Sequence, residues 1–475
     1  MAHYIRLYAS YQDNLKRCET MSASLQDGRE QGITGCLKRS NMRKDKATAF
    51  MATNLNCHLV RGKRVHLAGN VDRAYGGRKS SLASTLIDDA SASDDSDSEA
   101  SPTSEYVYSV VTHGCAAAHI MGFKEGGLRR LQQQLVSQSP PDPRLRERIE
   151  MREDVVRSQV LAIAGASFLN AVSLAASRGG QHRRRLQLSC STGFLLSIES
   201  LLSTVGAEKG MLEDMSEGIQ WLNSVVSFQL VQSAEANLRV EMSKCVSVTS
   251  TSTGDHVVAA FAVPPDVFSK LPEMLQQGHA IKLHAVMFTQ GINEMQSVAN
   301  HYLNSSLQDE LNFESVQMLQ RYFRVYQTEV MASGGDIEKR EADLAELAEL
   351  QSEIEALTGR LNVRTENVQK KCVNILITSS DICRRLGAGR TTCCKSGKDR
   401  TAMSVTLETS RLLVDHFHVK QGVHLCNAMR ERGVRRINVL ANTGKTKFAF
   451  NSFQLKYIPD CYKPPLACAD SHVAS

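Results

Sequence analysis

The stretch that most constrains the fold of this chain joins a short apolar run, a loop of small residues and an amphipathic run. Cys394 and Arg400 stand six positions apart in it, and Ser396 and Gly397 lie between them. Small residues let consecutive backbone N–H groups turn inward, and the run at 402–417 predicts a helix whose positive end faces the same point. The order strand, loop, helix therefore predicts an anion-binding loop.

The predicted loop has the chemistry of a phosphate-ester hydrolase that uses cysteine. At a helix N-terminus beside basic side chains a cysteine pKa typically falls to roughly 3.5–7.5, so we expect Cys394 to be a thiolate and the nucleophile. Arg400 offers a rigid fork of donors that holds two phosphate oxygens through the transition state. Hydrolysis would then pass through a cysteinyl-phosphate intermediate, a chemistry that needs no metal and no cofactor.

The residues around this pair are candidate substrate-binding groups. They are Lys395, Ser396, Gly397, Lys398 and Thr401. Two lysines supply more positive charge than one phosphomonoester needs. We therefore expect at least one of them, with Lys398 as the first choice, to contact a second phosphate of the substrate; the alternative is a general electrostatic bias.

A second Cys-x5-Arg spacing, from Cys426 to Arg432, lacks this context. It contains no Gly or Ser and lies within an amphipathic run typical of a helix. A motif needs its predicted surroundings, so we interpret this one as structural.

The sequence resembles a known family. The run CKSGKDRTAMSVTLE at 394–408 is similar to the C-terminal catalytic region of the inositol polyphosphate 4-phosphatases, types I and II. The resemblance extends to AAAHIMGFKEGGLRRL at 116–131, FLLSIESLLSTVGAEKGMLEDM at 194–215 and LHAVMFTQGINEMQSVA at 283–299, and covers roughly residues 45–465.

This resemblance implies a protein-tyrosine-phosphatase-like cradle and a substrate. The substrate would be phosphatidylinositol 3,4-bisphosphate, giving phosphatidylinositol 3-phosphate, with inositol 3,4-bisphosphate and 1,3,4-trisphosphate as soluble candidates. A cytoplasmic enzyme held peripherally on endosomal or plasma membranes would fit. Full-length animal members begin with a lipid-binding β-sandwich, and nothing before residue 45 here has the length or pattern of one.

Asp399 is the candidate general acid for the leaving group. Myotubularins carry a related loop with Asp before the Arg, and this chain has no Trp-Pro-Asp sequence that would supply a donor elsewhere. The alternative is that the Asp399 carboxylate only braces the loop.

Composition agrees with an intracellular globular enzyme. A chain of 475 residues with 42% hydrophobic content can bury a sizeable core, and thirteen cysteines without regular spacing argue against a disulfide framework. The sequence contains no Cys-x2-Cys pair with His partners, so it does not predict a zinc site. The net charge of +6 fits a membrane that contains phosphoinositides, or soluble inositol polyphosphates, as binding partners. The aromatic content is only 5% and the sequence has no dense basic stripe, which argues against nucleic acid as a partner. The apolar span at 160–176 contains polar residues and predicts a buried core helix.

Patterning along the chain predicts a mixed α/β fold, in which the Cys-x5-Arg cradle is joined to a largely α-helical body. The expected segments are a poorly ordered leader (1–45), a hairpin-containing start of the folded body (46–87), a disordered acidic Ser-rich insertion (88–105), a mainly helical body (106–335), a long amphipathic helix (336–370), a catalytic unit (371–465) and a tail (466–475). Helical periodicity dominates 127–230 apart from a break at 177–187, and 373–378 predicts a buried strand.

Leucines near heptad spacing at 336–361 leave two alternatives. This segment is either an arm for a coiled-coil partner or a long helix packed on its own chain, and barely three heptads favour the second.

Two other function classes stay open. A protein tyrosine or dual-specificity phosphatase would use the same Cys and Arg, but two lysines in the loop are unusual for it. A non-catalytic scaffold would carry the fold without turnover.

Overall fold

The computed structural model describes residues 55–63, 105–140, 142–234, 246–250, 256–302, 306–333, 337–362, 372–443, 446–448 and 450–469. The chain divides into two compact units, a smaller one of Met1–Arg39, Leu59–Tyr108 and Ser410–Gly422, and a larger one of Ser40–His58, Ser109–Thr409 and Val423–Ser475. The predicted leader at 1–45 and nearly all of the predicted acidic insertion at 88–105 lie outside the described residues.

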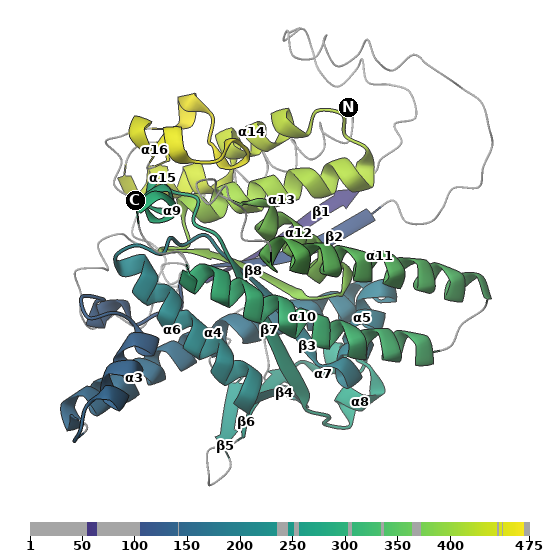
Figure 1. Cartoon of the computed structure of the whole chain (residues 1–475). Helices are drawn as coiled ribbons and strands as arrows, with labels where there is room; N and C mark the ends of the chain where they lie inside the picture. Colours follow the sequence, from purple (N-terminus) through teal and green to yellow (C-terminus); the bar gives the residue numbers. More distant parts are fainter. Residues whose placement is uncertain are drawn as a thin grey trace, which may run out of the picture. The chain divides into compact units, whose positions relative to one another are not determined.

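The described strands form a mixed sheet in the order β1-β2-β8-β3-β7-β4-β6-β5 (Figure 1). They are β1 (Asn56–Lys63), β2 (Glu105–Gly114), β3 (Phe194–Ser200), β4 (Val226–Gln232), β5 (Val246–Ser250), β6 (Val257–Val263), β7 (Ile281–Thr289) and β8 (Gly389–Cys394). Strands β2, β8, β3 and β7 run parallel to one another, while β7 pairs with β4 and β5 with β6 in the antiparallel sense. The strand that carries Cys394 thus lies in the parallel part of the sheet.

The described helices are α3 (Leu128–Ser137), α4 (Pro143–Arg178), α5 (Gly180–Thr192), α6 (Ala207–Val225), α7 (Pro265–Phe268), α8 (Glu273–Gln276), α9 (Glu294–Tyr302), α10 (Ser306–Ala332), α11 (Ile337–Asn362), α12 (Asn374–Arg385), α13 (Asp399–Phe417), α14 (Gly422–Arg432), α15 (Val434–Thr443) and α16 (Ser452–Tyr457).

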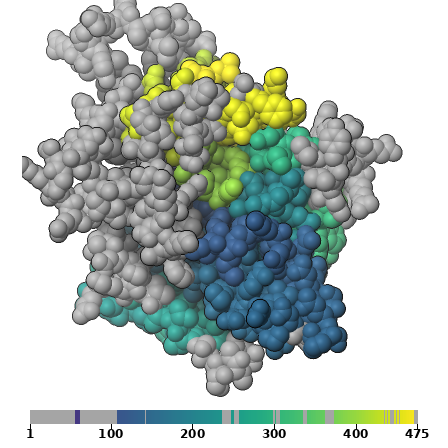
Figure 2. Space-filling model, turned by 90° about the vertical axis from the view of Figure 1, so that its left-hand side faces the viewer, coloured from purple at the N-terminus to yellow at the C-terminus, as the bar shows by residue number. Residues whose placement is uncertain are grey.

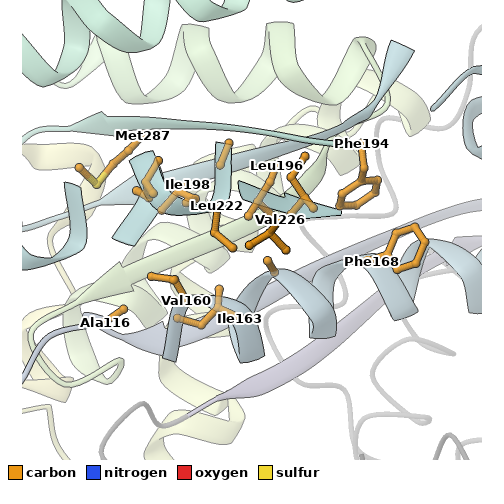
Figure 3. Packing of buried hydrophobic residues seen from close by; sticks show 14 of the residues in the cluster. Ala116, Val160, Ile163, Phe168, Phe194, Leu196, Ile198, Leu222, Val226 and Met287 are labelled. Carbon is orange, nitrogen blue, oxygen red and sulfur yellow. The ribbon is translucent and has the colours of Figure 1, made fainter. Parts of the chain in front are cut away.

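Two hydrophobic clusters cover the two faces of the sheet. One contains side chains of α3, α4 and α6, and Figure 3 shows Val160 and Ile163 of α4 on the side of the sheet where Leu196 and Ile198 of β3 lie. The other contains side chains of α10, α11, α12 and the C-terminal segment. A sheet buried on both faces is the usual α/β arrangement, and it explains why the residues of β3 are all buried.

The pleat of β8 separates its two cysteines. Successive side chains of a strand point to opposite faces, and Cys393 belongs to the cluster around α4 while Cys394 belongs to the cluster around α12. Both thiols are almost fully buried. Cys393 is therefore a core residue.

Helix α4 contains the apolar span noted in the sequence. Within the described part of the chain it is the one helix long and apolar enough to cross a membrane, but 61% of its most apolar window is buried in the protein. Its side chains pack on the sheet and on α6. This burial is what the prediction of a core helix requires.

The structure confirms several predicted elements and corrects others. The strand at 390–393 and the helix after the loop are present, and α11 buries Leu347, Leu350, Ile354 and Leu357 on its own chain. The strand predicted at 373–378 was wrong, because these residues lie at the start of α12. The run at 127–230, read as helical, contains β3 and β4, and the break at 177–187 is mostly helix α5. The body at 106–335 thus supplies most of the sheet, and β8 pairs between two of its strands.

Candidate functional site

Four parallel strands end at one edge of the sheet, and Cys394 is the last residue of the strand between β2 and β3. The backbone N–H of Cys115 donates to the carbonyl of Cys394 at 3.0 Å, and that of Leu201 donates to Cys393 at 2.9 Å. On the far side of β3, Gln290 after β7 donates to Ser200 at 3.0 Å. Ligands of parallel sheets bind beyond the carboxyl ends of the strands, so this edge is where a site is expected.

The segment after Cys394 is a tight loop that leads into α13. Gly397 has a φ of +64°, and a Cβ there would lie 2.5 Å from the carbonyl carbon of His113. Only glycine combines this backbone conformation with so close an approach. The predicted order of strand, loop and helix is present, and the small residue serves the close packing of the loop against the end of β2.

The loop stabilises the thiolate of Cys394. Burial by itself raises the pKa of this thiol, but the guanidinium of Arg400 and the hydroxyl of Thr401 act against it. The backbone N–H groups of Lys398 and Ser396 also bond to the sulfur. The net result is a pKa below the ordinary value of a cysteine, which favours the thiolate, the form that would attack a phosphorus atom.

Arg400 is held in place by a carboxylate from a distant part of the sequence. Its Nη2 donates to Glu208 Oε1 at 2.5 Å and its Nη1 to Glu208 Oε2 at 3.1 Å, while Nη1 also donates to the carbonyl of Leu201 at 2.9 Å. Ser203 donates to the same carboxylate from its backbone N–H and its hydroxyl, both at 2.8 Å. The guanidinium is therefore oriented by groups that follow β3.

The electrostatics of Glu208 agree with this anchoring. Burial by itself raises its pKa, but the charge of Arg400 and the bonds from Arg400 and Ser203 outweigh that effect and lower the pKa below the ordinary value. Glu208 remains a carboxylate at neutral pH and pairs with the guanidinium of Arg400. Sequence reasoning missed Glu208, because it lies 192 positions from Arg400 in a run with several other acidic residues.

Asp399, the candidate general acid, is buried and has a basic partner. Its Oδ1 accepts from Arg435 Nε of α15 at 2.5 Å. This ion pair ties the start of α13 to α15, which suits the bracing role that the sequence left as the alternative.

The predicted substrate-binding residues differ in exposure. Lys395 is exposed, whereas Ser396, Gly397 and Lys398 are half-buried and Thr401 is buried. The structure brings all of them to the loop around Cys394, as their spacing requires. Their contacts with a substrate stay a prediction. Figure 2 shows light-green surface, the colour of residues near 400, between the blue surface around α3 and the yellow C-terminal segment.

A buried ionic network lies behind the loop. Arg390 of β8 donates to Glu199 Oε2 at 2.9 Å and to Glu408 of α13 at 3.2 Å. Glu199 also accepts from Thr392 at 2.6 Å and from Ser404. These contacts tie the strand before the loop to the helix after it. Sequence reasoning did not single them out, since no local pattern marks them.

The second Cys-x5-Arg spacing lies within α14. Cys426 is buried, and the neighbouring Arg430 donates to the carbonyls of Met403, Cys461 and Lys463 at 3.0, 2.6 and 2.7 Å. No loop follows Cys426. This is the structural role that its sequence context predicted.

His113, Cys115 and His119 make hydrogen bonds to backbone carbonyls of the protein. His113 is fully buried, and its Nδ1 donates to the carbonyl of Gly114 at 2.8 Å. Burial lowers the pKa of His113 to about 4. Among the described residues no group of three or more His, Cys, Asp or Glu side chains is placed to hold a metal ion.

Comparison with known proteins extends the similarity beyond the loop. The chain is 33% identical over 319 residues, 67% of its length, to type II inositol 3,4-bisphosphate 4-phosphatase of Rattus norvegicus and, with the same figures, to inositol polyphosphate 4-phosphatase type II of Homo sapiens. The matched part is 32% of each relative, so the chain spans about a third of their length.

A relative with a different name also matches. The chain is 27% identical over 326 residues, 63% of its length and 19% of the relative, to the phosphatidylinositol 3,4,5-trisphosphate-dependent Rac exchanger 1 protein of Mus musculus. That name describes an exchanger and not a phosphatase.

The family model of the INPP4A C-terminal domain matches residues 135–462, which include β3, β7, β8, the loop after Cys394 and both members of the pair Arg400 and Glu208. This match covers well over half of the chain and agrees with the identities to the two 4-phosphatases. The chain belongs to the INPP4A C-terminal domain family.

Proposed function

We propose that this chain hydrolyses a phosphomonoester of a phosphoinositide or a soluble inositol polyphosphate. The observation that carries the proposal is a thiol of lowered pKa, Cys394, combined with the guanidinium of Arg400, which Glu208 fixes at the start of the helix after the loop. The names of the two similar 4-phosphatases point to the inositol class. The proposed reaction removes the 4-phosphate of phosphatidylinositol 3,4-bisphosphate, or of inositol 3,4-bisphosphate.

The proposed chemistry has two steps. The thiolate of Cys394 attacks phosphorus while the P–O bond to the inositol ring breaks, and a cysteinyl-phosphate forms. Water then attacks the phosphorus, the P–S bond breaks and the thiolate is restored. Arg400 holds two equatorial oxygens in both steps, because Glu208 keeps its fork in one orientation.

The substrate would reach this loop at a membrane surface. Lys395 and Lys398 add positive charge beside the anion-binding loop, which suits a ring that carries more than one phosphate. We propose a cytoplasmic protein that associates peripherally with endosomal or plasma membranes. A protein tyrosine phosphatase is the alternative within the same chemistry.

The test is phosphate release from a panel of phosphoinositides, soluble inositol phosphates and phosphotyrosine peptides. We expect the 3,4-bisphosphates to be the best substrates. Cys394→Ser abolishes turnover because an alcohol lacks the nucleophilicity of a thiolate at pH 7, while Cys426→Ser, the matched control, leaves it within about twofold. Faster release from phosphotyrosine would favour the protein phosphatase, and equal losses in the two variants would refute the assignment of Cys394.

A scaffold without turnover is the second candidate function. The similarity to a Rac exchanger favours it, since 63% of the chain matches a protein that is not named as a phosphatase. The two candidates differ in the panel: a scaffold binds inositides and releases no phosphate from any of them.

A further inference from the structure

Glu294 lies at the same edge of the sheet as the catalytic loop. It is the first residue of α9, shortly after the end of β7. Thr289 at the end of β7 pairs with Ser200 of β3, and Ser200 pairs with Cys393 of β8. The loop that carries Glu294 therefore follows a strand that is separated from the strand of Cys394 by β3 alone.

The side chains of this loop contact the groups that hold Arg400. Asn293, the neighbour of Glu294, donates from Nδ2 to Glu208 Oε2 at 3.5 Å. The negative charge of Glu294 itself acts on the guanidinium of Arg400, since it contributes to the raised pKa of that arginine, although burial acts in the opposite direction. Glu294 is thus within electrostatic range of the guanidinium of Arg400.

One carboxyl oxygen of Glu294 has a partner and the other has none. Oε1 accepts from Gln454 Nε2 of α16 at 3.1 Å, which fixes the side chain. Oε2 is buried, and no hydrogen-bond donor of the described residues reaches it. A buried carboxyl oxygen without a donor is costly, so its retention beside a reaction centre requires a reason.

The other acidic side chains around the loop are engaged. Glu208 pairs with Arg400, Asp399 with Arg435, and Glu199 with Arg390. Each of these carboxylates has a cation within 2.9 Å, and a proton on it would break the pair. Around the loop, among the described residues, Glu294 is the carboxyl whose second oxygen faces no donor.

His113 does not supply the proton either. Its pKa of about 4 makes the ring neutral at physiological pH, and the single ring proton is used by Nδ1 in the bond to the carbonyl of Gly114. A neutral ring with this tautomer has no N–H left for a leaving group.

We propose that Glu294 is the general acid and base of the hydrolysis, an assignment that rests on the proposed function. In the first step the P–O bond to the inositol breaks as the thiolate of Cys394 bonds to phosphorus, and the proton of the Glu294 carboxyl passes to the departing oxygen. In the second step the Glu294 carboxylate takes a proton from the attacking water, and the P–S bond breaks. The carboxyl ends protonated, the thiolate ends free, and orthophosphate leaves.

The charge of the leaving group fits this role. The inositol oxygen develops negative charge as the P–O bond breaks, and a proton from a carboxyl group neutralises that charge. Asp399, in its pair with Arg435, keeps the bracing role.

The test compares two leaving groups in Glu294→Gln. An inositol alkoxide needs a proton to depart, whereas 4-nitrophenolate departs without one. We expect kcat/KM on a short-chain phosphatidylinositol 3,4-bisphosphate to fall ~100-fold or more, and kcat/KM on 4-nitrophenyl phosphate to fall less than ~10-fold. The fall of the rate at alkaline pH, which reports loss of the acid's proton, should disappear in this variant.

Matched variants and a binding measurement separate chemistry from folding. Gln at 294 keeps an acceptor for Gln454 and removes one negative charge near Arg400, so vanadate should bind at least as tightly as to the unaltered chain. Glu294→Asp should recover part of the activity on the inositol ester. Asp399→Asn is assayed in parallel and should retain the alkaline limb.

The outcomes are distinct. The assignment of Glu294 would be overturned if Glu294→Gln lowered kcat/KM by equal factors on both substrates. It would also be overturned if Asp399→Asn, rather than Glu294→Gln, lost activity only on the inositol ester and lost the alkaline limb. Either result would leave the proposed function intact. A chain that releases phosphate from no inositol ester overturns both.

Discussion

Glu208→Gln tests whether the orientation of Arg400 depends on its distant carboxylate. The substitution keeps the volume of the side chain and removes its charge. The carboxylate accepts two bonds from Arg400 and two from Ser203, and a neutral amide retains only one oxygen for them. The guanidinium then loses both its bidentate partner and the charge that fixes its fork.

The structure sets the size of the expected effect. Removing one partner of a fully buried ion pair typically costs about 3–5 kcal/mol. The side chains of Arg400 and Glu208 are 13% and 12% exposed, and the amide still accepts one bond, so we expect about 2–4 kcal/mol of lost transition-state stabilisation. This corresponds to a loss of ~30- to ~900-fold in kcat/KM.

The assay is kcat/KM on phosphatidylinositol 3,4-bisphosphate, with vanadate affinity and Tm measured beside it. We expect vanadate to bind more weakly as well, because the oxyanion uses the same oriented fork. Glu314→Gln is the matched control, because Glu314 is 43% exposed and lies 3.6 Å from Arg129, away from the loop. If Glu208→Gln kept kcat/KM within about threefold, the reasoning that Glu208 orients Arg400 would be refuted.

Three further predictions concern the loop and its support. Gly397→Ala should abolish activity and lower Tm, because a Cβ at this φ of +64° would lie 2.5 Å from the backbone of His113. The control Gly359→Ala, on an open face of α11, should raise Tm slightly, and equal effects of the two substitutions on Tm would contradict the packing argument. Lys398→Met and Lys395→Met should lower kcat/KM by about ten- to a hundredfold more on the 3,4-bisphosphate than on a lipid with one phosphate. Equal factors on the two lipids would show that neither lysine contacts the second phosphate of the inositol ring. Burial lowers the pKa of His113 from 6.5 to about 4, so the unfolded chain binds a proton more readily than the folded protein does. The free energy of unfolding, measured with urea, should therefore fall by about 3 kcal/mol between pH 6.5 and pH 4. His113→Gln should remove this part of the fall.

Local patterns predicted the elements next to the site, and failed where a segment's neighbours decide its structure. The strand at 390–393 and the helix behind the loop follow from residue types within a few positions. In contrast, β3 and β4 lie within a run that was read as helical, and both are stabilised by hydrogen bonds to strands far away in sequence. Residues 373–378 are apolar enough for a strand, yet they begin α12, whose buried face packs in the cluster of α10 and α11.

The sequence by itself determined the spacing of Cys394 and Arg400, the small Gly397 between them and the helix that follows, because these depend on covalent distance and backbone sterics. Only the tertiary structure decided which groups tune that loop. Glu208 contacts Arg400 and Arg435 contacts Asp399 from other helices, and the charge of Glu294 acts on Arg400; no sequence spacing encodes such a meeting. The parallel strands bring their carboxyl ends to one edge, and their hydrogen-bonded register, rather than any local pattern, sets which side chains share the site.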